Sequence, residues 1–235
     1  MPTLLPNPPL FPAFVAQHTI CFDESDPRGV EVQFPGVVLP PGLGSAVRKR
    51  QLEYAAGRYC VREALRRCSP KDSDAVIGSG PSREPLWPAG LVGAITHTHQ
   101  YASAAVGRTR DARGIGLDAE RWMDHETAAR VVDGIADPTE VHAVARATGF
   151  SFARALTLIF SAKETLFKCC FPEVRRYFDF RDAALVEADA GRGVFTVELL
   201  ATLTPSLRAW SRFGGRFDHD DRLVRTAMVM LTRDP

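Results

Sequence analysis

The spacing of apolar residues along this chain of 235 residues predicts four helices. Between Ser45 and Arg67 there is no proline, and apolar residues recur at helical spacing beneath an arginine-rich face. These recurring residues are Leu52, Ala55, Ala56, Tyr59, Cys60 and Leu65. Two helices follow over 126–135 and 138–148, the second with Asp137 as N-cap and Pro138 at its first position. A longer apolar helix is predicted over 151–170.

Shorter apolar runs, bounded by glycine, proline and polar residues, predict the strands. The runs are 14–22, 91–99, 101–107, 114–120, 194–199, 215–218 and 224–231. The first half therefore has the order strand, helix, strand, strand, and a half of helices and strands follows it. There is no exact sequence repeat, but the two halves could be built alike.

One of these strands places two carboxylates side by side. Along 114–120, apolar and polar or small residues alternate, which is the period of a strand with one buried face. Asp118 and Glu120 therefore point the same way, with α-carbons about 6 to 7 Å apart. Both side chains can reach one hard cation, because oxygen ligands lie at about 2.0 to 2.1 Å from magnesium.

The segment 160–168 adds a third carboxylate and an ammonium group. Glu164 and Lys168 are four residues apart in a helical pattern, so one helix face presents both charges. That combination suits a metal-bound phosphate ester. Ser161 and Glu164 also have the spacing of a capping box, but the preceding apolar run already predicts helix and leaves no helix start there. Lys163 and Lys168 are two of only four lysines in the chain, which indicates a specific need for them.

Composition indicates a globular protein with no overall attraction to polyanions. Hydrophobic residues make up 45% of the chain and the formal net charge is +1, so any anion binding has to be local, and we expect neither nucleic acid nor membrane as a partner. The five cysteines have no CxxC spacing and include an adjacent pair, which indicates reduced thiols in a cytoplasmic protein. No run approaches the ~20 apolar residues that span a bilayer. Residues 1–12 are proline-rich without a basic start, which predicts an irregular arm and no signal peptide.

Each candidate group also has a structural explanation when it is taken alone. An Asp-x-Glu pair on a strand is usually a solvated face, and a single histidine such as His97 after an apolar strand is usually structural. Arg50 and Arg58 would simply be the polar face of the first long helix. The chain also has neither a Gly-x-Gly-x-x-Gly nor a P-loop signature, so the usual nucleotide cradles are absent from the sequence.

Taken in order, the segments 87–97, 114–120 and 160–168 resemble the 4'-phosphopantetheinyl transferase superfamily, in particular the stand-alone bacterial enzymes that activate surfactin and enterobactin synthetases. The resemblance extends through 48–58 and 213–217 and covers most of the chain from about residue 45. It implies an α+β pseudo-dimer of two similar subdomains, each with a small antiparallel sheet and a long helix. We expect these subdomains at 1–116 and 117–235, with the active site in the cleft between them.

The resemblance implies an enzyme that transfers the 4'-phosphopantetheine group of coenzyme A to a serine of an apo acyl or peptidyl carrier protein. Adenosine 3',5'-bisphosphate is released, and Mg²⁺, with Mn²⁺ as an alternative, is the expected cofactor. Asp118, Glu120 and Glu164 match the family's metal ligands, and Asp118, Glu164 and Lys168 its catalytic positions. Glu164, or a water on the metal, would take the serine proton, and Lys168 would assist the departing phosphate.

Coenzyme A is expected to be bound through its phosphates. Arg50 and Arg58 match family positions that bind the 3'-phosphate, and His97 matches a histidine that also reaches a coenzyme phosphate. Lys168 would contact the coenzyme as well. Arg83 is a further candidate, although relatives often have their basic residue one position earlier, where this chain has Ser82.

The sequence departs from the family pattern at positions that shape the site without carrying charge. Gly116 replaces a larger residue that is common before the Leu-Asp pair. Thr96 and Thr98 stand where serine is frequent on either side of the histidine. None of these changes removes a charged group, so the expected activity is unaffected.

Two other functions use the same residues. A metal-dependent phosphoesterase or nuclease would use Asp118, Glu120 and Glu164 on water, without needing the Arg50 and Arg58 helix. A catalytically inactive module that binds coenzyme A or a carrier protein would not need every carboxylate together with Lys168. The transferase is the favoured function, in fatty acid, polyketide, nonribosomal peptide or siderophore synthesis, by a monomer.

Overall fold

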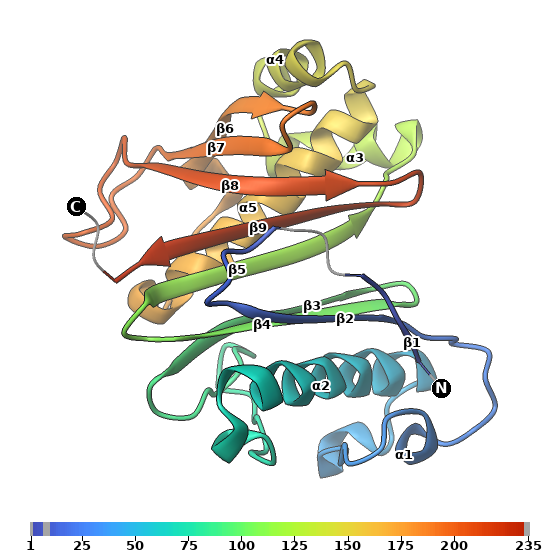
Figure 1. Cartoon of the computed structure of the whole chain (residues 1–235). Helices are drawn as coiled ribbons and strands as arrows, with labels where there is room; N and C mark the ends of the chain where they lie inside the picture. Colours follow the sequence, from blue (N-terminus) through green and yellow to red (C-terminus); the bar gives the residue numbers. More distant parts are fainter. Residues whose placement is uncertain (1, 7–9, 233–235) are drawn as a thin grey trace. The chain divides into compact units, whose positions relative to one another are not determined.

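The helices and strands gather into two units, Met1–Asp111 and Ala112–Pro235, in the computed structural model (Figure 1). The structure describes residues 2–6 and 10–232, so residues 1 and 7–9 of the predicted irregular arm lie outside the described residues. Each unit has its own antiparallel sheet and its own long helix. The predicted α+β class is therefore confirmed.

The first unit is a four-stranded sheet covered by one long helix. Its strands are β1 (Thr3–Leu4), β2 (Ala16–Cys21), β3 (Leu91–Thr98) and β4 (Tyr101–Arg108), and their order in the sheet is β1-β2-β4-β3. Its helices are α1 (Val30–Gln33) and α2 (Arg48–Cys68), with short 3₁₀ turns at Pro41–Leu43 and Pro70–Asp72. Helix α2 packs along β2, β3 and β4, and its apolar stripe, including the fully buried Leu52 and Leu65, forms the core of this unit.

The second unit has a five-stranded sheet with a longer helix against it. Its strands are β5 (Ala112–Arg121), β6 (Ala183–Asp189), β7 (Val194–Leu199), β8 (Arg212–His219) and β9 (Leu223–Leu231), in the order β5-β9-β8-β7-β6. Its helices are α3 (His125–Ile135), α4 (Pro138–Thr148) and α5 (Phe152–Val174), followed by a 3₁₀ turn at Phe180–Asp182. Helix α5 packs on β5 and β9, where Leu156, Ile159 and Leu166 are fully buried.

Strand β5 lies unusually close to α5, and two glycines make this possible. A β-carbon added at Gly114 would overlap the backbone carbonyl oxygen of Cys169, and one added at Gly116 would overlap that of Thr165. Backbone atoms of a buried helix cannot move aside as a flexible side chain can. The absence of side chains at these two positions therefore sets the distance between the strand and the helix, and with it the placement of Asp118 next to α5.

Most predicted elements agree with the structure, and their boundaries show why some do not. Helix α4 begins after Asp137, whose carboxylate accepts a hydrogen bond from the backbone N–H of Thr139 at 2.8 Å, as the sequence predicts. Helix α5 runs beyond the predicted end at 170 and includes Pro172. Pro172 has no backbone N–H, so one hydrogen bond of the helix is missing. This missing bond lies in the last turn, because the helix ends at Val174.

Two strands were absent from the sequence prediction. Strand β6 is the edge of the second sheet, pairs with β7 and shifts register between Leu185 and Glu187. Its sequence from Ala183 to Asp189 is rich in alanine and acidic residues, which have little intrinsic strand preference. Strand β1 has two residues and pairs only with β2. In both cases the neighbouring strand, not the local sequence, makes the segment extended.

The division between the units precedes β5, whereas the sequence-based boundary followed residue 116. Strand β5 pairs with β9 along its length, from Ala112 opposite Leu231 to Arg121 opposite Leu223. A boundary inside β5 would cut this ladder of hydrogen bonds.

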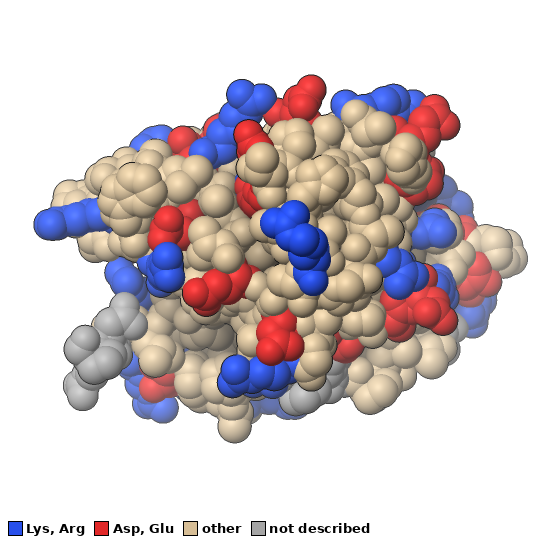
Figure 2. Space-filling view, turned by 90° about the horizontal axis from the view of Figure 1, so that it is seen from above, with Lys and Arg blue, Asp and Glu red and all other residues tan. Residues whose placement is uncertain are grey.

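Charge on one face and the apolar composition of the helices can be described directly. On the face seen in Figure 2, basic and acidic side chains are interspersed without a large region of one sign. Within the described residues, no single helix combines the length and apolar composition needed to cross a membrane. Helices α4 and α5 meet those criteria only as a pair, across a bend of 105°.

Candidate active site

Asp118 is the centre of a buried polar cluster between β5 and α5. Its side chain is almost fully buried, and its Oδ1 atom accepts a hydrogen bond from Lys168 Nζ at 2.6 Å. Its Oδ2 atom accepts another from Ser161 Oγ at 2.8 Å. Lys168 Nζ also lies 3.3 Å from the carbonyl oxygen of Leu117. Both carboxylate oxygens are thus held by groups of α5, which defines the orientation of Asp118.

Three hydroxyl groups support this arrangement. Thr226 on β9 lies directly opposite Asp118 in the sheet. Its Oγ1 atom is 2.8 Å from Ser161 Oγ and 2.6 Å from Thr165 Oγ1. The sequence analysis did not assign these hydroxyls. The spacing of Ser161, Thr165 and Lys168 at i, i+4 and i+7 was the available signal, because it places all three on one helix face.

Glu120 and Glu164 complete the group of carboxyls, and their environment disfavours ionisation. Burial and the neighbouring charge of Asp118 raise the pKa of Glu120 to about 8, although Lys168 opposes this shift. Burial also raises the pKa of Glu164; Lys168 opposes that shift, and the charge of Asp118 adds to it. Both shifts favour the protonated form of these carboxyls.

Lys168 keeps its positive charge in spite of its surroundings. Burial alone would disfavour the ammonium form, but Asp118, Glu164 and Glu120 together raise the pKa of Lys168 above its ordinary value. The cluster contains three carboxyl groups and one ammonium. When all are ionised it has an excess of negative charge.

The chemistry of this donor set fits a hard divalent cation. Carboxylate oxygens are the ligands that Mg²⁺ and Mn²⁺ prefer, and a cation next to Glu120 would favour its ionised form. Within residues 2–6 and 10–232, however, no three His, Cys, Asp or Glu side chains lie close enough together to hold a metal ion. The metal role of Asp118, Glu120 and Glu164 therefore stays a prediction, supported by charge and donor type.

Lys163 lies apart from this cluster, although it is in the same sequence segment as Lys168. Its buried Nζ atom donates to the carbonyl oxygen of Ile135 at 2.9 Å and to Glu140 Oε2 at 3.1 Å. Glu140 also accepts a hydrogen bond from the backbone N–H of Leu185 at 2.8 Å through its other oxygen. Lys163 and Glu140 thus join α5 to α3, α4 and β6. The specific need that the small number of lysines indicated is, for Lys163, a structural one.

In the first unit, Arg58 is held against α2 and the following loop. Its guanidinium carbon lies 4.7 Å from the centre of the Tyr54 ring, and one nitrogen donates to Ser79 Oγ at 3.1 Å. Ser79 forms an antiparallel bridge with Pro85, and the two residues close a tight loop. Arg83 lies in this loop, with a backbone φ of 65°. Arg58 and the Arg83 loop are therefore directly connected.

Arg50 and His97 are also associated with α2. Arg50 is exposed near the start of the helix. His97, at the end of β3, has its Nδ1 atom 4.0 Å from Glu53 Oε2 on α2. The predicted phosphate-binding residues of the first unit thus belong to α2 and to the segments packed next to it, whereas the predicted acid–base and metal residues all belong to β5 and α5 of the second unit. A shared cleft stays a prediction.

Comparison with known proteins identifies similar sequences over both units. Residues 41–107 match the family model described as "4'-phosphopantetheinyl transferase N-terminal domain". Residues 114–221 match the model of the "4'-phosphopantetheinyl transferase superfamily". These two ranges contain every residue predicted for the site.

Individual relatives agree with the family models. The chain is 34% identical over 215 residues to "4'-phosphopantetheinyl transferase PptT" of Mycobacterium tuberculosis, which covers 88% of this chain and 89% of the relative. It is 33% identical over 200 residues to "4'-phosphopantetheinyl transferase Npt" of Nocardia iowensis, covering 80% and 85%. It is 41% identical over 126 residues to "Enterobactin synthase component D" of Salmonella typhi, covering 54% of this chain and 50% of that protein. The similarity thus spans half the length of the Salmonella relative and most of the other two.

Proposed function

The chain belongs to the 4'-phosphopantetheinyl transferase superfamily, and we propose that it transfers the 4'-phosphopantetheine group of coenzyme A to a serine of an apo acyl or peptidyl carrier protein. Adenosine 3',5'-bisphosphate is the second product. The observation that carries the proposal is the ion pair of Lys168 Nζ with Asp118 Oδ1 at 2.6 Å, next to Glu120 and Glu164. This cluster combines a fixed cation with one buried and two half-buried carboxyls, and attack on a pyrophosphate requires groups that neutralise charge and accept a proton.

The reaction needs a base for the serine hydroxyl and a positive charge next to the departing phosphate. Glu164 is the proposed base, because burial raises its pKa and makes its carboxylate a stronger proton acceptor than an exposed one. Lys168 is the proposed cation, since its raised pKa keeps it charged in a partly buried place. One helix turn separates the two residues, so the proton acceptor and the cation share one face of α5.

A divalent ion would be held by Asp118, Glu120 and Glu164, and when bound it would neutralise charge on the pyrophosphate and act as a Lewis acid. The ligands' own contacts support this proposal. Ser161 and Lys168 hold both oxygens of Asp118 in one orientation, which lowers the entropy lost when a ligand binds there.

Coenzyme A is the proposed donor, and residues of the first unit would bind its phosphates. A guanidinium has five N–H donors. One nitrogen atom of Arg58 donates both to Ser79 Oγ and to the carbonyl oxygen of Gly78, which leaves the other nitrogen atoms to bind a phosphate. Arg50, Arg83 and His97 are the other proposed contacts. Because the 3'-phosphate and the pyrophosphate belong to one molecule, the proposed reaction requires both sets of residues to meet in one cleft.

The decisive experiment is to incubate the protein with coenzyme A, MgCl₂ and a panel of apo carrier proteins, and then to weigh each carrier by mass spectrometry. At least one carrier should gain one phosphopantetheine group. The same carrier with its acceptor serine replaced by alanine is the control and should gain nothing. If no carrier in a broad panel gains mass, or if the gain persists in the serine-less control, the proposed function is wrong.

A further inference from the structure

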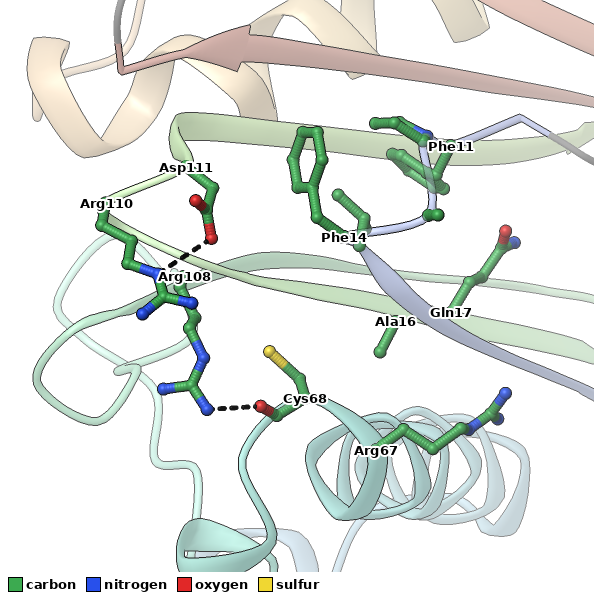
Figure 3. A pocket seen from close by; sticks show the side chains of 12 residues that line it. Phe11, Phe14, Ala16, Gln17, Arg67, Cys68, Arg108, Arg110 and Asp111 are labelled. Atoms are coloured by element: carbon green, nitrogen blue, oxygen red, sulfur yellow. Dashed lines mark hydrogen bonds and ion pairs between the residues drawn. The ribbon is translucent and has the colours of Figure 1, made fainter.

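A cavity of about 520 Å³ opens in the first unit at the C-terminal end of α2. Three arginines, Arg67, Arg108 and Arg110, line it together with Cys68, Phe11 and Phe14 (Figure 3). Figure 3 shows the arginines coming from two places, the last turn of α2 and the end of β4 with the turn after it. The two phenylalanines come from the segment before β2 and lie across the cavity from Arg67 and Cys68. The cavity thus has a basic side and an aromatic side.

The arginines have hydrogen-bond donors to spare. Arg67 donates to His18 Nδ1 at 2.7 Å, Arg108 donates to the carbonyl oxygen of Cys68 at 2.8 Å, and Arg110 pairs with Asp111 at 3.3 Å. Each guanidinium has five N–H groups in a planar fork, and these contacts use few of them. Figure 3 shows the guanidinium group of Arg67 turned away from those of Arg108 and Arg110, and it contacts His18 instead. Arg108 and Arg110, with the carboxylate of Asp111, leave one positive charge in excess at their end of the cavity.

The aromatic side offers apolar surface to a ligand. The side chain of Phe14 is 40% exposed, which places it among the exposed large hydrophobic residues of the protein. Phe11 is half-buried beside it. Exposed aromatic rings within a concave site favour a ligand with an apolar part, because covering such rings removes apolar area from water.

This cavity is separate from the residues proposed to bind coenzyme A phosphates. Arg67 is nine residues beyond Arg58 and seventeen beyond Arg50 on the same helix, which correspond to about 13 and 25 Å along the axis. Arg108 and Arg110 are likewise at the far end of β4 from Tyr101, which lies next to the strand end that carries His97. One phosphate group cannot contact both sets of arginines.

We propose that this cavity binds a second ligand, an organic phosphate monoester whose apolar part packs against Phe14 while Arg108 and Arg110 hold the phosphate. A phosphate monoester carries a charge of about −1.5 to −2 at pH 7, opposite in sign to the excess charge of these two arginines. Planar guanidinium groups bind phosphate oxygens in pairs, and the volume is within the range of small-molecule sites, about 300–1,000 Å³. The proposal does not depend on the transferase reaction.

Phenyl phosphate is the probe, because it joins a phosphate to one aromatic ring. Calorimetric titration of the full chain with phenyl phosphate should show saturable binding. Inorganic phosphate and phenol should each bind at least about tenfold more weakly than phenyl phosphate. Arg110→Gln, at an exposed position, should weaken phenyl phosphate binding by about tenfold or more. Phe14→Ser should weaken phenyl phosphate without weakening inorganic phosphate. Arg146→Gln, at an exposed position on α4, is the matched control and should have no effect.

Cys68 provides an independent readout inside the cavity. Cys68 and Cys21 are both half-buried, but only Cys68 lines the cavity. Phenyl phosphate should therefore slow alkylation of Cys68 by iodoacetamide, as measured by peptide mass spectrometry, and leave Cys21 unaffected.

Three results would overturn the proposal. One is the absence of saturable phenyl phosphate binding at millimolar concentrations. The second is binding that Arg110→Gln leaves unchanged in a protein whose melting temperature matches the parent. The third is displacement of phenyl phosphate by coenzyme A, since this would make the cavity part of the coenzyme site. Retained binding in excess coenzyme A supports a separate site, whether or not the protein modifies a carrier.

Discussion

The backbone carbonyl oxygen of Thr165 occupies the place that the β-carbon of any larger residue at position 116 would need, and so Gly116 and α5 are in direct backbone contact. Thr165 is adjacent to Glu164 and three residues before Lys168. The contact at Gly116 therefore controls how far these two charged groups stand from Asp118. Glycine is the residue that permits the closest approach at this position.

We expect Gly116→Val to destabilise the second unit and to reduce carrier modification. The new side chain must push α5 away from β5, and overpacking of this kind costs about 1–3 kcal/mol or more. Urea unfolding measures the loss of stability, and the mass of the carrier measures the activity. Gly134→Ala on α3 is the control, because nothing lies within 4 Å of the added β-carbon. It should stabilise the helix by about 0.5–1 kcal/mol, and equal effects of the two substitutions would contradict the argument.

Replacement of Lys168 by methionine should remove the positive charge next to the departing phosphate while keeping the length of the side chain. We expect the rate of carrier modification to fall about 100-fold or more, the usual cost of losing a charged group aimed at the transition state. Lys71→Met, at an exposed position after α2, should leave the rate unchanged. A rate within a few-fold of the parent for Lys168→Met would remove this lysine from the mechanism.

Asp118→Asn and Glu164→Gln each replace a charged oxygen by a neutral amide of nearly the same shape. Both should abolish transfer with little change in circular dichroism, because the hydrogen bond from Ser161 to position 118 can be kept by an amide oxygen. Glu126→Gln on the exposed face of α3 is the comparison, and it should transfer at the parental rate. Parental transfer rates in both site variants would contradict the proposed metal and base roles.

The pair of Lys163 and Glu140 should matter for stability and not directly for chemistry. Lys163→Met leaves the buried Glu140 carboxylate without its cation and should cost about 3–5 kcal/mol. In the double variant Lys163→Met/Glu140→Gln, the carboxylate charge is gone while an oxygen still accepts from Leu185, so much of this loss should be recovered. A urea double-mutant cycle measures the coupling; strictly additive losses would show that the two groups act independently.

His18 should make the protein less stable in mild acid. Burial and the adjacent Arg67 guanidinium lower the pKa of His18 below 6.5, and the more distant Glu63 only partly opposes this. As the pH falls below 6.5, the unfolded chain binds a proton that the folded protein does not, and so stability is lost from there downward. The urea midpoint should fall between pH 7.5 and 5.5 for the parent and fall less for His18→Gln. Identical pH profiles would rule out this histidine as the cause.

Asp118, Glu120, Glu164 and Lys168 were predicted to be neighbours from local sequence spacing, because each pair lies within one element, whereas Arg50, Arg58, Arg83 and His97 came from the family resemblance. Asp118 and Glu120 are two apart on β5, and Glu164 and Lys168 are four apart on α5. Such spacings fix which side chains share a face as soon as the element type is known. This spacing singled out Lys168 but left the role of Lys163 open, and only the packing of α5 shows that Lys163 pairs with Glu140.

The sequence by itself determined the long helices, most strands and which charged residues share one face of β5 or of α5, since periodicity and short spacings are properties of the local chain. The tertiary structure decided what surrounds those residues. The hydrogen bonds of Asp118 to Ser161 and Lys168, the position of Thr226 opposite it, and the edge strand β6 all depend on segments that are far apart in sequence. Backbone approach at Gly116 and the burial that shifts the pKa of Glu120 arise only when β5 and α5 pack together, and no local pattern encodes that distance.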